Sequence, residues 1–335
     1  MEKIPNFKII GSGSEEEKAK VEDTLEKRLY DNRGFISERD IDRLKALEYP
    51  KGDVEHAAIN FSNRYTSALL ERAGIPNFDI LANNYFIMPN DEYLKVADPD
   101  SNATAFTLRK VTALNALKVR SKPLFIAMVI LHETTHLKSF LSVELSEGEK
   151  AEDKSLFRDG VIVYSSEKKD EEAGFSHSHF KGLQEAIIAN LEKRAFSEMS
   201  KLPELQDEIA RLNTPEILEK RKKISEKKKI PIEDILWVSD TTEDYNWVAY
   251  PRTRFVLDYV CDEIQKEFSD EYKSSEEVFQ EFSNAQFNGN LMTIARLVDG
   301  AFGKGSFRIL GNMDTDANSA ALCMETLKKL RLQKA

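Results

Sequence analysis

The chain has 335 residues with an apolar content of 41%, which is enough for one large domain or two modest ones with a substantial core. Asp and Glu number 58 against 48 Lys and Arg, so the formal net charge is −10, and this negative field argues against a nucleic-acid partner. The two cysteines, Cys261 and Cys323, are far apart and outside any CxxC pattern, which argues against a disulfide framework and a cysteine-based zinc site.

The sequence shows no targeting or membrane segment. Its first residues, MEKIPNFKIIGSGSEEEK, include no apolar run of signal-peptide length. The longest apolar stretch, residues 124–131, is too short to cross a bilayer. We therefore expect a soluble, cytoplasmic protein with no membrane partner, and the sequence leaves its oligomeric state open.

The first third of the chain alternates predicted strands and helices. Residues 7–10 read as a short strand, and a helix is expected to begin at Glu15, because Ser14 can cap it and acidic residues favour the positive end of its dipole. The patterns that follow predict, in order, a helix near Ser37, a helix over 54–74, a strand over 85–88 and a further strand over 105–117.

A buried helix is predicted after Ser121-Lys122-Pro123, since proline is tolerated in a first turn and the apolar run 124–131 continues from it. Residues 161–164 and 175–180 flank the charged turn KKDEEAG and are expected to pair as a hairpin. A second important helix covers 182–194, and beyond it the chain reads as mainly helical and highly charged.

The predicted buried helix carries LHETTHLKSFL at residues 131–141. His132 and His136 are four residues apart, so both imidazoles project from one helix face and can bind a single ion. Glu133 adjoins the first histidine and can act as a general base on a metal-bound water. The alternative is a chance HExxH whose histidines are satisfied in the core, but such polar groups continue an apolar helix, where burial without partners is costly.

A zinc site needs a third protein ligand. Glu185 is the best candidate, because this acid lies in an otherwise apolar helical stretch, GLQEAII. The alternative is that Glu185 is an acid near a helix N-terminus, where its negative charge interacts favourably with the helix dipole. Glu192, two turns further on, is the reserve ligand, and His177 and His179 share a strand face that lies either near the metal or at the surface.

HETTH followed by QEAII resembles the gluzincin class of zinc metallopeptidases, typified by thermolysin. The resemblance implies that His132, His136 and Glu185 bind Zn2+, that Glu133 is the general base, and that the substrate is a peptide or protein. It also implies a zincin-like α+β fold, with a small mixed sheet and the active-site helix. We expect residues 1–200 to form this core with both ligand helices, and residues 201–335 to form a mainly helical C-terminal part.

The chain departs from the gluzincin pattern at two positions. Gln184 stands where asparagine is common, and Ala189 stands where an acid often orients the first histidine, so another group must hold that imidazole. Gluzincins also use a downstream histidine or tyrosine to stabilise the oxyanion. No histidine follows His179 in this chain, so the donor would be a tyrosine or an arginine. The candidates, for which a packed surface loop is the alternative, are Tyr245, Tyr250, Arg252 and Arg254.

Two further hypotheses concern partners. A strand at 112–116, if it lies at a sheet edge, would bind an extended peptide by backbone pairing. The basic cluster 220–229, KRKKISEKKK, can contact an anionic partner, but it also fits a solvated helix face or a linker, and we assign it no function.

Two functions compete with peptide hydrolysis. The first is a catalytically inactive, peptidase-like zinc protein that acts as a binding or regulatory module, for which the missing acid at Ala189 is the support. The second is a helical interaction protein that acts through its charged C-terminal third.

Overall fold

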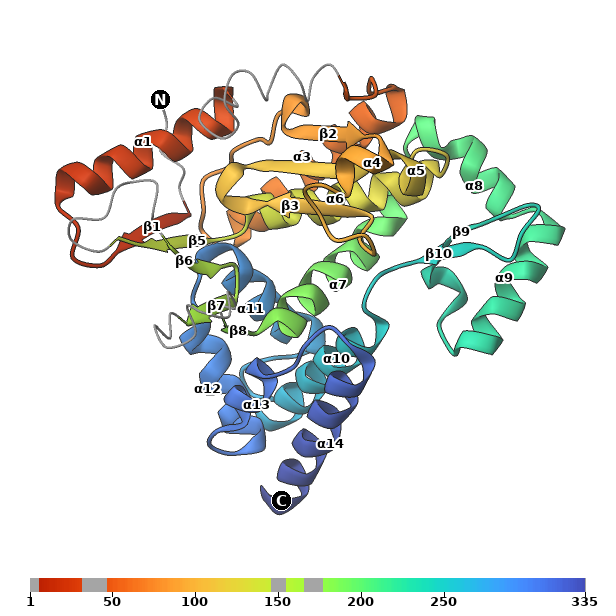
Figure 1. Ribbon diagram of the computed structural model, residues 1–335. Helices are drawn as coiled ribbons and strands as arrows, with labels where there is room; N and C mark the ends of the chain where they lie inside the picture. Colours follow the sequence, from red (N-terminus) through yellow and green to blue (C-terminus); the bar gives the residue numbers. More distant parts are fainter. Residues whose placement is uncertain (1–5, 32–46, 146–154, 166–176, 335) are drawn as a thin grey trace.

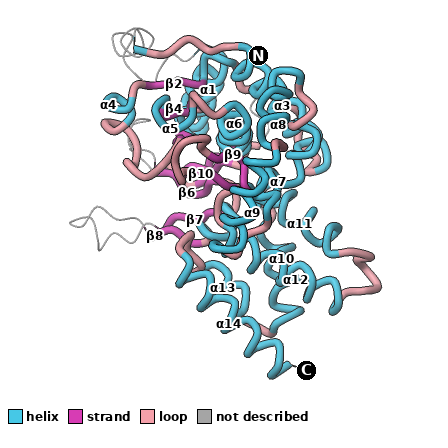
Figure 2. The backbone as a smooth tube through the Cα atoms, turned by 90° about the vertical axis from the view of Figure 1, so that its right-hand side faces the viewer, coloured by secondary structure: helices cyan, strands magenta, loops and turns pink. Residues whose placement is uncertain are grey.

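The computed structural model describes residues 6–31, 47–145, 155–165 and 177–334 (Figure 1). The chain is a mixed α+β protein with small sheets in its first part and a helical C-terminal part, as expected. Figure 2 shows the C-terminal helices extending away from the part that holds the sheets. The helix expected near Ser37 lies outside the described residues.

A three-stranded sheet lies beside the helix that carries the HETTH motif. Its strand order is β2-β4-β3, with β4 parallel to β2 and antiparallel to β3. The strands are β2 (Tyr85–Met88), β3 (Ala103–Phe106) and β4 (Val111–Asn115).

This order corrects two expectations. The run 105–117 is not one strand, because the chain turns at Lys110, whose φ of 52° is left-handed, and then returns antiparallel to β3. The predicted edge strand at 112–116 is also wrong, because β4 lies between two neighbours and all five of its residues are buried. The edge strands are β2, whose residues are all buried, and β3, whose residues are all half-buried.

The second sheet has five strands in the order β1-β5-β6-β7-β8. Strand β1 is parallel to β5, and every later pair is antiparallel. The predicted hairpin is confirmed, because Val163 lies opposite His179, although the turn between its strands is outside the described residues. The strands are β1 (Phe7–Ile10), β5 (Leu141–Glu144), β6 (Ser155–Asp159), β7 (Ile162–Ser165) and β8 (His177–His179).

Four long helices of the first part begin close to where the sequence places them. Ser14 caps the first of these, and Glu17 accepts a hydrogen bond from the backbone N–H of Ser14 at 2.7 Å, which completes a capping box. The motif helix begins at Pro123, as predicted, and packs between its neighbours α3 and α7. The helices are α1 (Glu15–Asp31), α3 (Asp53–Arg72), α6 (Pro123–Lys138) and α7 (Lys181–Met199).

The C-terminal part is helical except for one two-stranded hairpin that the sequence did not reveal. In Figure 1 this hairpin and α9 form an arm at the right of the molecule. The elements are α8 (Gln206–Leu212), α9 (Pro215–Lys228), β9 (Ile235–Val238), β10 (Tyr245–Trp247), α10 (Pro251–Glu267), α11 (Ser275–Asn288), α12 (Leu291–Phe302), α13 (Ser306–Gly311) and α14 (Ala317–Lys334).

One continuous apolar core joins the motif helix to the C-terminal helices. It includes Leu131 on α6, Ile187 on α7 and Val260 on α10, all fully buried. Among the described helices, none combines the length and the apolar character that crossing a membrane requires. The core therefore fixes α6 and α7 against each other, and these two helices carry the candidate site.

Candidate metal centre

Helix α6 presents the HETTH motif on its last two turns. The first part of the helix is buried in the core, and threonine side chains anchor the motif itself. The hydroxyl of Thr134 bonds to Tyr85 at 2.6 Å, and the hydroxyl of Thr135 donates to the carbonyl of Leu131 at 2.9 Å. The two threonines between the histidines thus face the protein, and the histidines face the space between α6 and α7.

Helix α7 brings Glu185 to the same space. Its start is held by Gly182, whose N–H donates to the carbonyl of Met313 at 2.9 Å. A Cβ at this glycine would lie 2.6 Å from the carbonyl oxygens of Met313 and Asp314, so only glycine permits this approach. The backbone contact thereby sets the position of Glu185, which lies three residues further along α7.

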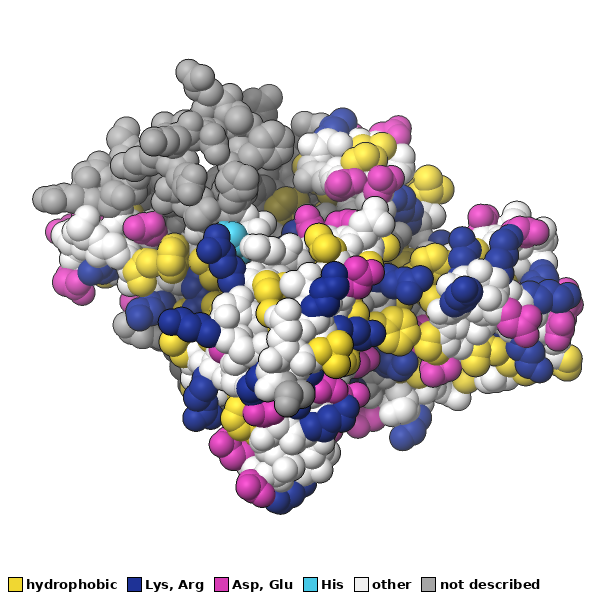
Figure 3. All heavy atoms as spheres, turned by 90° about the horizontal axis from the view of Figure 1, so that it is seen from below, with side chains coloured by type: hydrophobic (Ala, Val, Ile, Leu, Met, Phe, Trp, Pro, Cys, Tyr) yellow, Lys and Arg dark blue, Asp and Glu magenta, His cyan; other side chains and the backbone are white. Residues whose placement is uncertain are grey.

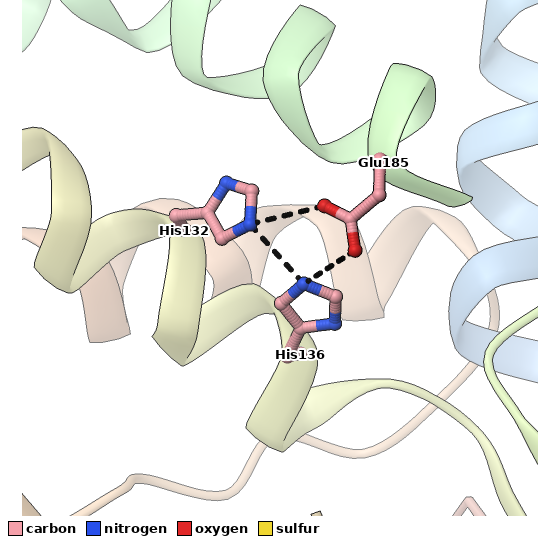
Figure 4. Close-up of side chains that lie close together, drawn as sticks. All are labelled: His132, His136 and Glu185. Atoms are coloured by element: carbon pink, nitrogen blue, oxygen red, sulfur yellow. Dashed lines mark hydrogen bonds and ion pairs between the residues drawn. The ribbon is translucent and has the colours of Figure 1, made fainter. Parts of the chain in front are cut away.

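The three predicted ligands converge on one point (Figure 4). Nε2 of His132 lies 3.2 Å from Nε2 of His136 and 3.3 Å from Oε2 of Glu185. Nε2 of His136 lies 3.6 Å from Oε1 of Glu185. Nearly nine-tenths of the surface of each side chain is buried. Within the described residues, this is the one group of three metal-binding side chains close enough to share an ion.

These distances fit a metal ion. Ligand atoms that lie about 2.0–2.2 Å from a tetrahedral ion are about 3.3–3.6 Å from one another. The two Nε2 atoms are 3.2 Å apart and lie 3.3 and 3.6 Å from the two different oxygens of the Glu185 carboxylate, which is close to that spacing. In addition, Oε2 of Glu185 is buried and makes no hydrogen bond to any described residue. The cluster could therefore hold a metal ion, and it leaves a fourth position for another ligand.

Glu192 has a different place from the one the sequence suggested. It is not a member of the three-ligand cluster; its Oε1 lies 3.1 Å from Nδ1 of His132. A carboxylate there holds the ring proton on Nδ1 and leaves the lone pair of Nε2 for a metal. Glu192 thus fills the role that Ala189 cannot. The sequence feature that indicated a place near the site was the seven-residue spacing between Glu185 and Glu192, which puts both acids on nearly the same face of α7.

The second imidazole has a weaker partner. The amide nitrogen of Gln184 lies 3.4 Å from Nδ1 of His136, which is long for a hydrogen bond. The amide oxygen of the same side chain accepts a hydrogen bond from the N–H of Val161 at 3.1 Å. Gln184 therefore packs α7 against the five-stranded sheet while it borders the metal centre.

The electrostatics of the cluster favour a cation. Burial lowers the pKa of His132, but the carboxylates of Glu192 and Glu185 outweigh burial and raise this pKa well above its usual value. Burial raises the pKa of Glu185, but His136 and His132 hold it well below its usual value. These carboxylates therefore stabilise positive charge between the helices, which either protons on the imidazoles or a bound metal ion can supply.

Glu133 stands outside the ligand cluster and beside it. It is 6% exposed, and burial raises the pKa of its carboxyl, while His132 and His136 oppose that rise. A carboxylate with a raised pKa beside a metal position is suited to accept and release protons. The role of general base, which the sequence assigned to Glu133, stays a prediction.

A cavity of about 410 Å³ borders the cluster at His132, the one of the three ligands that lines it. One wall is α6, with His132 and Glu133, and the opposite walls come from the residues before β3 and from the hairpin that contains β10. Asp100, Ser101 and Asn102 in this lining were not predicted, because the order of the strands could not be derived from the sequence. The full lining is Asp100, Ser101, Asn102, Ala103, Phe125, Met128, Val129, His132, Glu133, Glu192, Leu236, Tyr245, Asn246, Trp247, Val248, Ala249 and Tyr250.

The structure separates the four candidate oxyanion donors. Tyr250 and Tyr245 line the cavity, and the Tyr250 ring centroid lies 6.2 Å from that of His132. Tyr250 has a left-handed φ of 56°, and Glu185, together with burial, raises its pKa, so its hydroxyl keeps its proton. Arg254 instead forms a buried ion pair with Asp234 at 2.5 Å, and Arg252 is exposed.

The remaining histidine candidates lie on β8. His179 lies on β8 and is half-buried, and it is absent from the ligand group found among the described residues. His177 lies on the same strand, where its backbone pairs with Ser165. No family model, no curated protein and no solved structure matches this chain, so its site is interpreted from its own residues.

Proposed function

We propose that the chain is a zincin-like, zinc-dependent peptidase. The observation that carries this proposal is the convergence of two imidazoles and one carboxylate that could hold a metal ion, with the buried Glu133 beside them and a cavity at His132. Two imidazoles and one carboxylate are a common ligand set of catalytic zinc, which keeps a fourth position open. This ligand set and the buried HETTH helix are what the gluzincin resemblance contributes to the proposal.

The roles of the residues follow from their positions. A bound zinc ion would polarise the substrate carbonyl and make a water molecule more acidic. Glu133 would take the proton from that water and deliver it to the leaving amine, because it is a buried carboxylate next to the first metal ligand. Tyr250 would donate a hydrogen bond to the carbonyl oxygen as negative charge develops there. Glu192 would keep the His132 ring in its metal-binding orientation.

The substrate strand would pair with β3. This strand ends the three-stranded sheet, and its first residue, Ala103, lines the cavity. An extended peptide can add to such an edge through backbone hydrogen bonds. Strand β3 therefore takes the place of the interior strand β4 in the account of substrate binding.

The inactive zinc protein is the competing function. Its support in the sequence was the lack of an acid at Ala189 to orient His132, and Glu192 now lies at that imidazole nitrogen. We therefore favour the peptidase over a binding or regulatory module.

The test is the variant Glu133→Gln, compared with wild type and with Glu198→Gln, a matched change of an exposed acid on α7. Zinc content is measured by elemental mass spectrometry, and hydrolysis is measured with a quenched-fluorescence peptide library. We expect Glu133→Gln to keep its zinc and lose hydrolysis, while Glu198→Gln keeps both. Undiminished hydrolysis in Glu133→Gln would remove its assigned role, and no cleavage by zinc-loaded wild type would sink the peptidase proposal.

A further inference from the structure

A second cavity, of about 320 Å³, lies between α9 and the β9–β10 hairpin. We call it the α9 groove. Its lining on α9 follows the spacing of one helix face, i, i+3, i+4, i+7 and i+8. These residues are Lys220, Lys223, Ile224, Lys227 and Lys228, and the hairpin side is lined by Val238, Thr242, Glu243 and Tyr245.

The α9 groove is apolar where it is buried and cationic where it is exposed. Val238 is buried and Ile224 is half-buried, whereas Lys223, Lys227 and Lys228 are exposed. Helix α9 carries six basic and three acidic side chains in a chain whose net charge is −10. The arm at the right of Figure 3 shows basic side chains gathered over this region. The lining thus combines local positive charge with an apolar floor.

Most of this positive charge is available to a ligand. Lys220 is engaged, because its Nζ donates to the carbonyl of Asp240 at 2.6 Å and so ties α9 to the hairpin. Lys223 has only a loose, exposed ion pair with Glu219 at 3.7 Å, which water and ligands readily replace. Within the described residues, Lys227 makes no ion pair, and Glu243 is the one acid in the lining. The groove therefore has uncompensated cationic charge.

The α9 groove adjoins the metal cavity at one residue. Tyr245, on β10, lines both. Its ring contacts Trp247 at a centroid distance of 5.0 Å, and Trp247 also lines the metal cavity. A peptide that lies across the metal centre can therefore extend past Tyr245 into the α9 groove.

We propose that the α9 groove binds an acidic segment of the peptide substrate, to one side of the bond that is cleaved. This proposal rests on the proposed function. A peptide is the expected ligand because the groove adjoins the metal cavity, where the peptide substrate would be cleaved. The lysines supply electrostatic complementarity to the acids, and Ile224 and Val238 contact the aliphatic parts of the segment. A polyanion such as nucleic acid is disfavoured by the negative charge of the whole chain.

The test measures binding rather than cleavage, in the presence of a zinc chelator so that the peptides stay intact. Three fluorescein-labelled peptides share one apolar centre: one has an acidic run before it, one has the run after it, and one has Gln and Asn in place of the acids. Affinity is measured by fluorescence anisotropy on wild type, Lys227→Glu and Lys222→Glu. Lys222 is an exposed lysine of the same helix that does not line the groove, so it controls for the long-range change in charge.

We expect one of the acidic peptides to bind wild type about tenfold more tightly than the neutral peptide, with affinity that falls as salt rises. Lys227→Glu should remove that preference, and Lys222→Glu should change it less than about twofold. Equal binding of acidic and neutral peptides, or equal effects of the two variants, would overturn the proposal. So would displacement of the acidic peptide by an oligonucleotide that binds more tightly and also depends on Lys227.

Zinc content and hydrolysis are measured on the same proteins, so that the two proposals fail separately. Lysine-dependent binding of an acidic peptide without any cleavage supports the groove and removes the peptidase. Cleavage without any preference for acidic peptides removes the groove alone.

Discussion

Removal of the Glu192 carboxylate tests how the metal centre is held together. Glu192 is 4% exposed, and its Oε1 lies 3.1 Å from Nδ1 of His132. When Nε2 of His132 binds a metal, Nδ1 must carry the proton and donate to this carboxylate. Glu192→Ala removes both the acceptor and its negative charge, and Glu192→Gln removes the charge but keeps an oxygen that can accept.

The expected loss of zinc affinity follows from the contribution that carboxylates behind metal-binding histidines make in known metal sites. Loss of a carboxylate behind a metal-binding histidine lowers metal affinity by about 10–100-fold, or roughly 1.4–2.7 kcal/mol. We expect Glu192→Ala near the upper end and Glu192→Gln near the lower end. A competitive titration with a chromogenic zinc chelator measures both, with Glu198→Gln as the control on the exposed face of α7.

Two outcomes would refute this reasoning. If Glu192→Ala bound zinc as tightly as wild type, the contact with His132 would have no role in metal binding. If it lost zinc as completely as Glu185→Ala, Glu192 would be a ligand. Thermal unfolding of the metal-free variants, followed by circular dichroism, separates either outcome from a loss of folding.

Three further changes probe the rest of the molecule. Burial lowers the pKa of Lys110 to about 8, so below that pH the folded state holds a buried charge. The stability of wild type relative to Lys110→Met should therefore rise by roughly 2 kcal/mol between about pH 7 and about pH 9.5, as this charge is lost from the folded state first. Urea unfolding at the two pH values measures this, and a constant difference would contradict it. Gly182→Ala should lower the free energy of unfolding in urea by about 1–3 kcal/mol and weaken zinc binding, because the new Cβ would displace the start of α7 and with it Glu185. If neither value changed, α7 would adjust freely to the added Cβ. Tyr250→Phe should keep its zinc and lower kcat by about 10²-fold in the peptide assay, and an unchanged kcat would exclude Tyr250 as the oxyanion donor.

Local patterns in the sequence predicted the elements that carry the ligands. Proline followed by an apolar run located α6, and the spacing of the HETTH motif put both imidazoles on one face. Glu185 was found for a similar reason, since an acid in an apolar helix needs a positive partner. These inferences depend on neighbours within a few turns of one helix, and such spacings are fixed by helix geometry.

The features that depend on contacts between distant segments could not be predicted in the same way. A run of β-branched and apolar residues does not reveal a left-handed turn at Lys110, nor does it show which strand lies at the edge. The spacing of Glu192 from Glu185 indicated a shared face, but not that the carboxylate meets Nδ1 of His132. The β9–β10 hairpin, which supplies Tyr245 and one wall of the cavity, is short and lies in a highly charged region whose pattern favours helices.

The central claim is that His132, His136 and Glu185 hold one metal ion. It is tested most directly by elemental mass spectrometry of wild type, His132→Ala and Glu185→Ala, each supplemented with zinc and then dialysed extensively against metal-free buffer. The account predicts about one zinc per wild-type chain and none in either variant. Wild-type protein without zinc, or a Glu185→Ala variant that keeps its zinc, would contradict it.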